Sequence, residues 1–99
     1  MISRQWRGLA RPESAQAYVE HLKSETFPAL RKLRGFRRAA ILRRELPEGV
    51  EFLVITEWES VEFIRAFAGA RADAAVVPQA VRDMMIEYDR VVRHYDVVD

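Results

Sequence analysis

Two histidines are the side chains of this sequence best suited to proton transfer near neutral pH. His94 lies in an apolar run close to the C-terminus, and His21 lies at the edge of an apolar helical stripe. Because imidazole titrates near neutral pH, His94 is the candidate catalytic base. No nucleophile or metal ligand stands at a spacing that would pair with it. The alternative is a histidine that only hydrogen-bonds a neighbouring strand or lies at a dimer interface.

The sequence has no pattern that binds a metal or a nucleotide. Metal sites need several convergent His or carboxylate ligands, and the two histidines form neither HxH nor HxxxH spacing. The chain has no cysteine, which excludes thiolate zinc sites, disulfides and cysteine nucleophiles. Its four glycines are scattered and form no phosphate-binding loop. We therefore expect neither a metal nor an organic cofactor.

Aromatic side chains offer a second kind of site, a pocket for a flat ligand. Trp58 ends a predicted strand directly before a helix, and we expect Trp6 to share its helix-facing side of the sheet. Two indoles would suit a small aromatic ligand. The predicted lining residues are Trp6, Tyr18, His21, Trp58, Phe63 and Phe67. The alternative is a core tryptophan packed under two phenylalanines, since most buried aromatic side chains only pack.

Hydrophobic periodicity predicts the elements that would position these residues. The predicted strands cover 2–9, 36–46, 50–58 and 88–98, and the predicted helices cover 12–34, 61–68 and 79–86. Pro28 lies inside the first helix, so we expect a kink or break near Phe27. Residues 70–77 carry no clear signal. The order predicts an α+β fold, a single ferredoxin-like split β-α-β domain over 1–99, with a four-stranded antiparallel sheet and the long helices on one face.

Both faces of the third predicted strand carry large apolar side chains. Phe52, Val54, Thr56 and Trp58 point one way, and Glu51, Leu53, Ile55 and Glu57 point the other. A sheet with one solvated face would alternate cleanly between apolar and polar residues. Since no helix is left to cover the second face, we expect a second copy of the sheet to cover it. The sequence therefore predicts a homodimer.

The charges and the hydropathy indicate what the chain does not contact. It has 16 basic and 15 acidic residues, and a nucleic-acid binder would show a patch of one sign. We read the acids as interspersed among the arginines and expect no nucleic-acid partner. Arg37, Arg38, Arg43 and Arg44 could orient an anionic substrate or pair with Glu51 and Glu57. No apolar run approaches the ~20 residues that span a bilayer, and no signal peptide is evident, so we expect a cytoplasmic protein with no membrane contact.

Four segments resemble the antibiotic-biosynthesis-monooxygenase-like family. They are 4–8 (RQWRG), 52–60 (FLVITEWES), 64–69 (IRAFAG) and 94–98 (HYDVV), and the resemblance extends over nearly the whole chain. It implies the dimeric α/β-barrel fold, in which two ferredoxin-like sheets pack face to face. Members include cofactor-independent monooxygenases of aromatic polyketides, quinol monooxygenases and haem-degrading enzymes.

The haem-degrading members have a catalytic set that is only partly present here. Trp58 stands at the tryptophan of that set, but Trp6 or Gln5 stands where those members have an asparagine. Residues 73–77, where the haem-ligating histidine would lie, contain no histidine. Three functions stay open: a cofactor-independent oxygenase of a small aromatic or polyketide-like substrate, a non-catalytic binding protein for a small hydrophobic ligand, and a purely structural homodimer.

Overall fold

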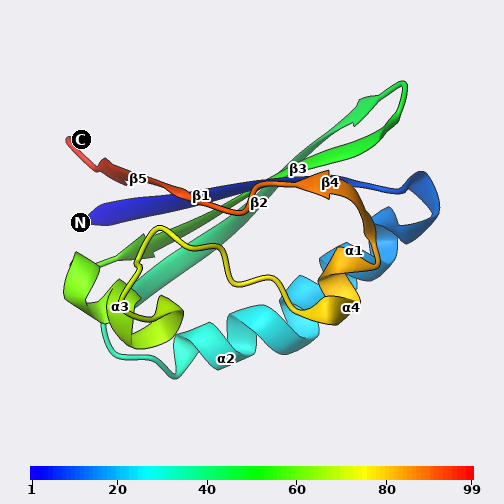
Figure 1. Ribbon diagram of the computed structural model, residues 1–99. Coiled ribbons are helices and arrows are strands. Elements are labelled where there is room, and N and C mark those ends of the chain that lie inside the picture. Colours follow the sequence, from blue (N-terminus) through cyan, green and yellow to red (C-terminus); the bar gives the residue numbers. More distant parts are fainter.

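Strand β1 (Ile2–Ala10) lies in the interior of an antiparallel sheet whose order is β2-β3-β1-β4. The computed structural model describes residues 1–99 and places every helix on one face of that sheet (Figure 1). The other strands are β2 (Phe36–Leu46), β3 (Gly49–Trp58), β4 (Met85–Tyr88) and β5 (Arg93–Asp96). This is the predicted ferredoxin-like arrangement, and the first three strands start and end within one residue of the predicted ranges.

The first helical segment is continuous through Pro28. It comprises a 3-10 turn (Pro12–Ser14), α1 (Ala15–His21), a π-helical turn (Leu22–Thr26) and α2 (Phe27–Arg31). The backbone N–H of Phe27 bonds the carbonyl of Leu22, five residues back. The wide turn makes room for the proline ring directly after it, so the helix accommodates Pro28 without a break.

The C-terminal part of the chain differs from the prediction in two ways. The predicted helix 79–86 ends early, because α4 covers only Gln79–Arg82 and Met85 and Ile86 belong to strand β4. In place of the predicted single strand over 88–98 there are two short strands, β4, which shares only Tyr88 with that range, and β5. Both pair with the same edge of β1, β4 beside Gly8 and β5 beside Arg4. Between β4 and β5 the chain leaves β1 and pairs with the loop after α3. There the Val92 N–H donates to the Asp73 carbonyl at 2.8 Å.

Helix α3 (Val61–Ala68) ends where the sequence indicated, at a glycine. Gly69 has φ +91°, a conformation that residues with a Cβ rarely adopt. Ser60 occupies the N-cap position, but its side chain makes no capping hydrogen bond. None of the helices combines the length and the apolar composition that a membrane-spanning helix needs.

The core lies between the sheet and the helices. The helix-facing side chains of β3, Phe52, Val54, Thr56 and Trp58, are all buried, as the alternation predicts. The opposite face has no helix over it (Figure 1). There Leu53 and Ile55 are half-buried, while Leu42 on β2 is 50% exposed.

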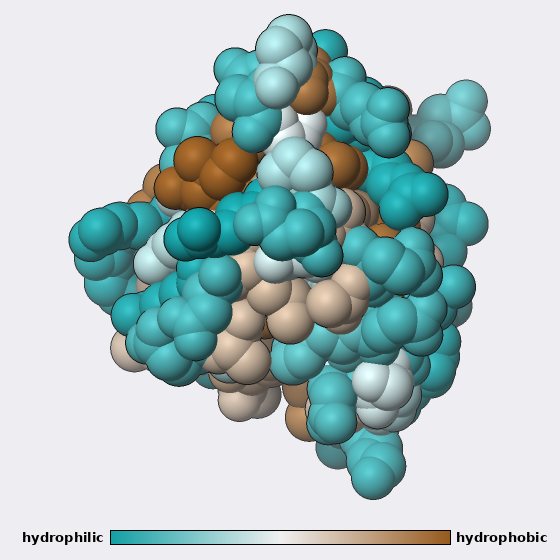
Figure 2. Space-filling view, turned by 90° about the vertical axis from the view of Figure 1, so that its right-hand side faces the viewer, coloured by the Kyte–Doolittle hydropathy of each residue, from teal (hydrophilic) through white to brown (hydrophobic).

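Ion pairs surround these apolar side chains on the open face. Glu51 accepts hydrogen bonds from Arg7 and Arg44, both at 2.6 Å, and Arg38 bonds Glu57 at 2.8 Å. The two guanidinium groups, Arg44 first, lower the pKa of Glu51. Seen from the right-hand side of Figure 1, strongly hydrophobic side chains reach the surface on the sheet side of the molecule among hydrophilic ones (Figure 2).

Candidate functional site

A cavity of about 550 Å³ lies between the first helical segment and β1. One wall is the inner face of the helical segment and the turn that follows α2. It consists of Tyr18, His21, Leu22, Glu25, Thr26, Ala29, Leu30 and Leu33. The other wall comes from β1, α3, the loop after α3 and α4, with Trp6, Ala66, Phe67, Val76, Val77, Pro78 and Val81. Eleven of the fifteen lining residues are hydrophobic, which is typical of a small-molecule site.

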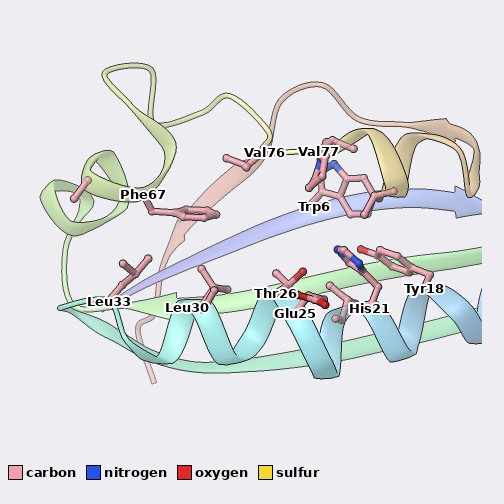
Figure 3. Close-up of a pocket in the computed structure, with 15 residues that line it drawn as sticks. Trp6, Tyr18, His21, Glu25, Thr26, Leu30, Leu33, Phe67, Val76 and Val77 are labelled. Atoms are coloured by element: carbon pink, nitrogen blue, oxygen red, sulfur yellow. The ribbon is translucent and has the colours of Figure 1, made fainter.

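The side chains of this cavity that can exchange a proton come from the helical wall. Figure 3 shows Tyr18 and His21 pointing from the helix toward Trp6 on β1, with Glu25 one turn further along. Burial raises the pKa of the Tyr18 hydroxyl well above its ordinary value, so this group stays protonated and can donate a hydrogen bond. The half-buried His21 imidazole lines the same cavity and is its candidate proton acceptor.

Trp6 is held rigidly on the opposite wall. Its indole N–H donates to the Asp89 carbonyl at 2.8 Å, and its ring lies 6.1 Å from Tyr18 and 6.4 Å from Tyr88, between centroids. Asp89 belongs to the stretch between β4 and β5 where the chain leaves β1. The break in the C-terminal strand therefore supplies the acceptor that orients this indole.

Two of the predicted lining residues do not line the cavity. Trp58 is fully buried, donates its N–H to the Thr56 hydroxyl at 2.9 Å, and stacks on Phe67 at 5.8 Å between centroids. The ring of Phe63 packs against Gly35, where a Cβ would collide with it. Trp6, Tyr18, His21 and Phe67 do reach the cavity. The second tryptophan is thus a core residue that supports Phe67 from behind.

His94 lies in a separate cluster on the helix-facing side of β1 and β5. The Arg4 guanidinium donates to its Nε2 at 3.0 Å and also bonds the carbonyls of Ala72 and of Ala74, the latter at 2.8 Å. Since a guanidinium can only donate, Nε2 carries no proton and its lone pair is occupied. Burial first, and then the positive charge of Arg4, lower the pKa of His94. His94 does not line the cavity, so it is poorly placed to be the base of that site.

The Arg4 cluster has a structural consequence for the cavity. Burial lowers the pKa of Arg4 to about 10, so it still carries its charge at neutral pH. Its bonds to Ala72 and Ala74 fix the loop after α3, whose next residues, Val76 and Val77, form part of the cavity wall. Sequence patterns gave no indication of this wall, because the loop has no periodicity.

The lowered pKa of His94 predicts a pH effect on stability. The unfolded chain takes up a proton near pH 6.5, whereas the folded chain does so at lower pH, so this stabilisation is present above about 6.5 and is lost as the pH falls below it. Titration of the imidazole by NMR should give a pKa below 6.5. A His94→Gln variant should lose that part of the pH dependence in urea unfolding, and an imidazole titrating above 6.5 would contradict the hydrogen bond from Arg4.

Several cavity residues lay within a pattern that the sequence did show. Leu22, Thr26, Ala29 and Leu30 recur at helical spacing within the predicted helix 12–34, and so form an apolar stripe along it. The stripe is only partly filled by sheet side chains, and the unfilled part is the cavity. Nothing in the local pattern separates a helix residue that packs on the sheet from one that faces a void.

Comparison with known proteins identifies the family to which the chain belongs. A family model described as antibiotic biosynthesis monooxygenase matches residues 1–78. The chain belongs to the antibiotic biosynthesis monooxygenase family. No curated protein sequence matches it.

Solved structures of other members share the fold. A Bacillus cereus protein assigned to the antibiotic biosynthesis monooxygenases is 20% identical, with TM-score 0.70, over 100% of this chain and 93% of that one. A Deinococcus radiodurans protein assigned to the same family is 15% identical, with TM-score 0.68, over 100% and 94%. The haem-degrading protein MhuD from Mycobacterium tuberculosis, solved with two haems in its active site, is 22% identical, with TM-score 0.60, over 99% and 96%. At these identities the likeness establishes the fold of this family member.

Proposed function

We propose that this protein is a cofactor-independent oxygenase of a small electron-rich aromatic compound, such as a phenol, a hydroquinone or a polyketide-like ring. The observation that carries the proposal is the cavity of about 550 Å³ with Trp6 on one wall and Tyr18 and His21 directed at it from the other. A largely apolar lining favours a flat ring and molecular oxygen over polar ligands. Membership of the family supports the same reading.

In the proposed reaction His21 removes the proton of the substrate hydroxyl, and the Tyr18 hydroxyl donates a hydrogen bond to the phenolate oxygen that forms. The phenolate gives one electron to oxygen, and the phenoxyl radical combines with superoxide at a ring carbon that carries hydrogen. The peroxide anion that forms takes the proton back from His21. Loss of water from the resulting hydroperoxide leaves a quinone. The balance is one phenol and one O₂ giving one quinone and one water, so no other reductant is needed.

Haem is a less suitable substrate for this cavity. MhuD was solved with haem in its active site, but in this chain the single imidazole at the cavity is His21, on the helix, and residues 70–78 contain no histidine. We therefore place an organic aromatic substrate ahead of haem.

An oxygen-consumption screen tests the proposal. Purified protein without added cofactor is given phenols, hydroquinones and hydroxynaphthoquinones, and uptake is recorded against heat-denatured protein. Uptake with formation of the quinone supports the oxygenase. Tight binding of a compound without uptake would favour the alternative, a binding protein for a small hydrophobic ligand. The absence of both uptake and binding would favour a structural role.

We propose the cytoplasm as the compartment of this protein, because a chain without cysteine suits a reducing environment.

We also propose that the open sheet face pairs with a second copy of the chain. Leu42, Leu53 and Ile55 lie on that face, and the ion pairs of Glu51 and Glu57 surround them. An apolar centre with a charged rim is the usual composition of a protein interface. A specific dimer of this kind buries about 1,600 Å² in total.

A double substitution on this face tests the dimer. Leu53→Glu with Ile55→Glu should convert the dimer into a monomer, because four unpaired carboxylates would meet across the two-fold interface. Sedimentation velocity at low micromolar concentration provides the measurement. The matched control is Ala70→Glu with Ala80→Glu, which adds the same charge at two exposed positions. A monomeric wild-type protein at that concentration, or a double variant that remains dimeric, would contradict the proposed interface.

A further inference from the structure

The charges of this chain are more segregated than the overall balance suggests. Residues 31–44 contain seven basic residues and no acidic residue, which leaves nine basic against fifteen acidic residues in the rest of the chain. The expectation that acids lie among the arginines is therefore wrong for this segment. It forms the end of α2, the following turn and most of β2, the edge strand of the sheet.

A groove of about 530 Å³ runs between this edge strand and the outer face of the helical segment. Its apolar lining includes Val19 and Phe27 from the helix and Ala39 and Ile41 from β2. Its basic lining residues are Lys23, Arg31 and Arg43, and no acidic side chain lines it. Arg37, Arg38 and Arg44 of the segment pair with carboxylates on β3 or directly after it, whereas the three cations of the groove form no ion pair.

The groove is separate from the cavity of the proposed function. The helical segment presents Val19, Lys23, Phe27 and Arg31 to the groove at a spacing of four residues, and it presents a different set to the cavity. No side chain lines both sites. The two sites therefore lie on opposite faces of one helix, and neither depends on the other for its lining.

We propose that this groove binds an amphipathic anion, an acyl or aryl chain that carries one carboxylate, sulfonate or phosphate group. The chain lies along the apolar lining, where its burial is favourable. The anionic head meets up to three cations, two of them guanidinium groups that can hold a carboxylate or phosphate with two hydrogen bonds. These cations lack protein partners, so the head replaces water rather than a competing carboxylate.

Two other occupants fit the groove less well. Single-stranded nucleic acid is held by aromatic side chains on which bases stack, and the one aromatic ring here, Phe27, is only 6% exposed. A second copy of β2 would bring like charges together, since lysine and arginine on an edge strand oppose edge-to-edge pairing. A small amphipathic anion satisfies both the apolar lining and the unpaired charges.

Calorimetry with dodecanoate tests the site, below its micelle concentration and in about 50 mM salt. A groove variant, Lys23→Gln with Arg31→Gln and Arg43→Gln, should bind dodecanoate at least about tenfold more weakly than wild type. The control variant, Arg11→Gln with Arg65→Gln and Arg90→Gln, loses the same charge outside both sites and should bind within about twofold of wild type. Dodecyl maltoside, a neutral amphiphile, should bind much more weakly than dodecanoate.

Three results would overturn the proposal. The first is equal affinity for dodecanoate in the groove variant and wild type, which would place the ligand in the other cavity. The second is no binding by wild type below about 1 mM, or binding only to vesicles of phosphatidylglycerol. The third is a groove variant whose oligomeric state differs from that of wild type in sedimentation, which would make the groove an interface between copies. Thermal unfolding of all three proteins checks that each is folded.

Discussion

A His21→Gln variant is expected to oxidise an aromatic substrate about 10²- to 10⁴-fold more slowly than the wild-type protein, which is the range that a positioned acid or base contributes. Glutamine keeps the size and hydrogen-bonding ability of the side chain but cannot take the substrate proton. The loss should appear in kcat rather than in KM, because the ring would still bind between Trp6 and the helix. Oxygen consumption at saturating substrate measures it.

The comparison with two other variants makes this test specific. Glu20→Gln changes an exposed residue of the same helix outside the cavity and should leave kcat unchanged. His94→Gln should affect kcat far less than His21→Gln, because the lone pair of His94 is occupied by Arg4. A large loss in the His94 variant with none in the His21 variant would reverse the assignment of the base.

These two histidines show where sequence reasoning reached its limit. His94 was preferred because it lies on a predicted strand, and the structure does place it in strand β5. Its partner, Arg4, is 90 residues away in the sequence, and only the pairing of β5 with β1 brings the two together. A hydrogen bond between strands at opposite ends of the chain leaves no local signal.

The strands that were predicted well are those whose alternation is enforced by burial. In β3 every second residue is buried, so a change of register by one residue would turn Trp58 and Phe52 out of the core. The C-terminal strand lacks this constraint. Of the residues between β4 and β5, Asp89 hydrogen-bonds to β1, whereas Val92 hydrogen-bonds to the loop after α3. This change of partner interrupts the strand.

The cationic groove illustrates a different limit of prediction from sequence. The sequence shows which residues are basic, but it does not show which of them lie together on one side of β2. Of the seven basic residues in 31–44, Arg37, Arg38, Arg43 and Arg44 were considered as possible partners of Glu51 and Glu57. Only those whose side chains lie across the strand from Glu51, Glu57 or Glu59 form such a pair. Arg43 points to the helix side of β2, where no acid is present, and this depends on the pleat of the strand rather than on composition.

A Trp58→Ala variant is expected to lose about 3–5 kcal/mol of unfolding free energy, which is the usual cost of emptying a large aromatic site in a core. The side chain is fully buried, and its ring supports Phe36 edge-on at 5.3 Å and Phe67 by stacking at 5.8 Å, between centroids. Truncation also leaves the Thr56 hydroxyl without its donor. Urea unfolding followed by circular dichroism gives the free energy.

Trp6→Phe is the matched control, because it changes the other tryptophan, which is half-buried and faces the cavity. It removes the bond to the Asp89 carbonyl but keeps an aromatic wall, so it should cost about 0.5–1.5 kcal/mol, the net worth of one hydrogen bond. Its main effect should be on the affinity for aromatic ligands. A fully packed indole cannot be removed without leaving a void, and the side chains around a void lose their van der Waals contacts. If Trp58→Ala instead left stability nearly intact and abolished ligand binding, Trp58 would line the site and its assignment to the core would be wrong.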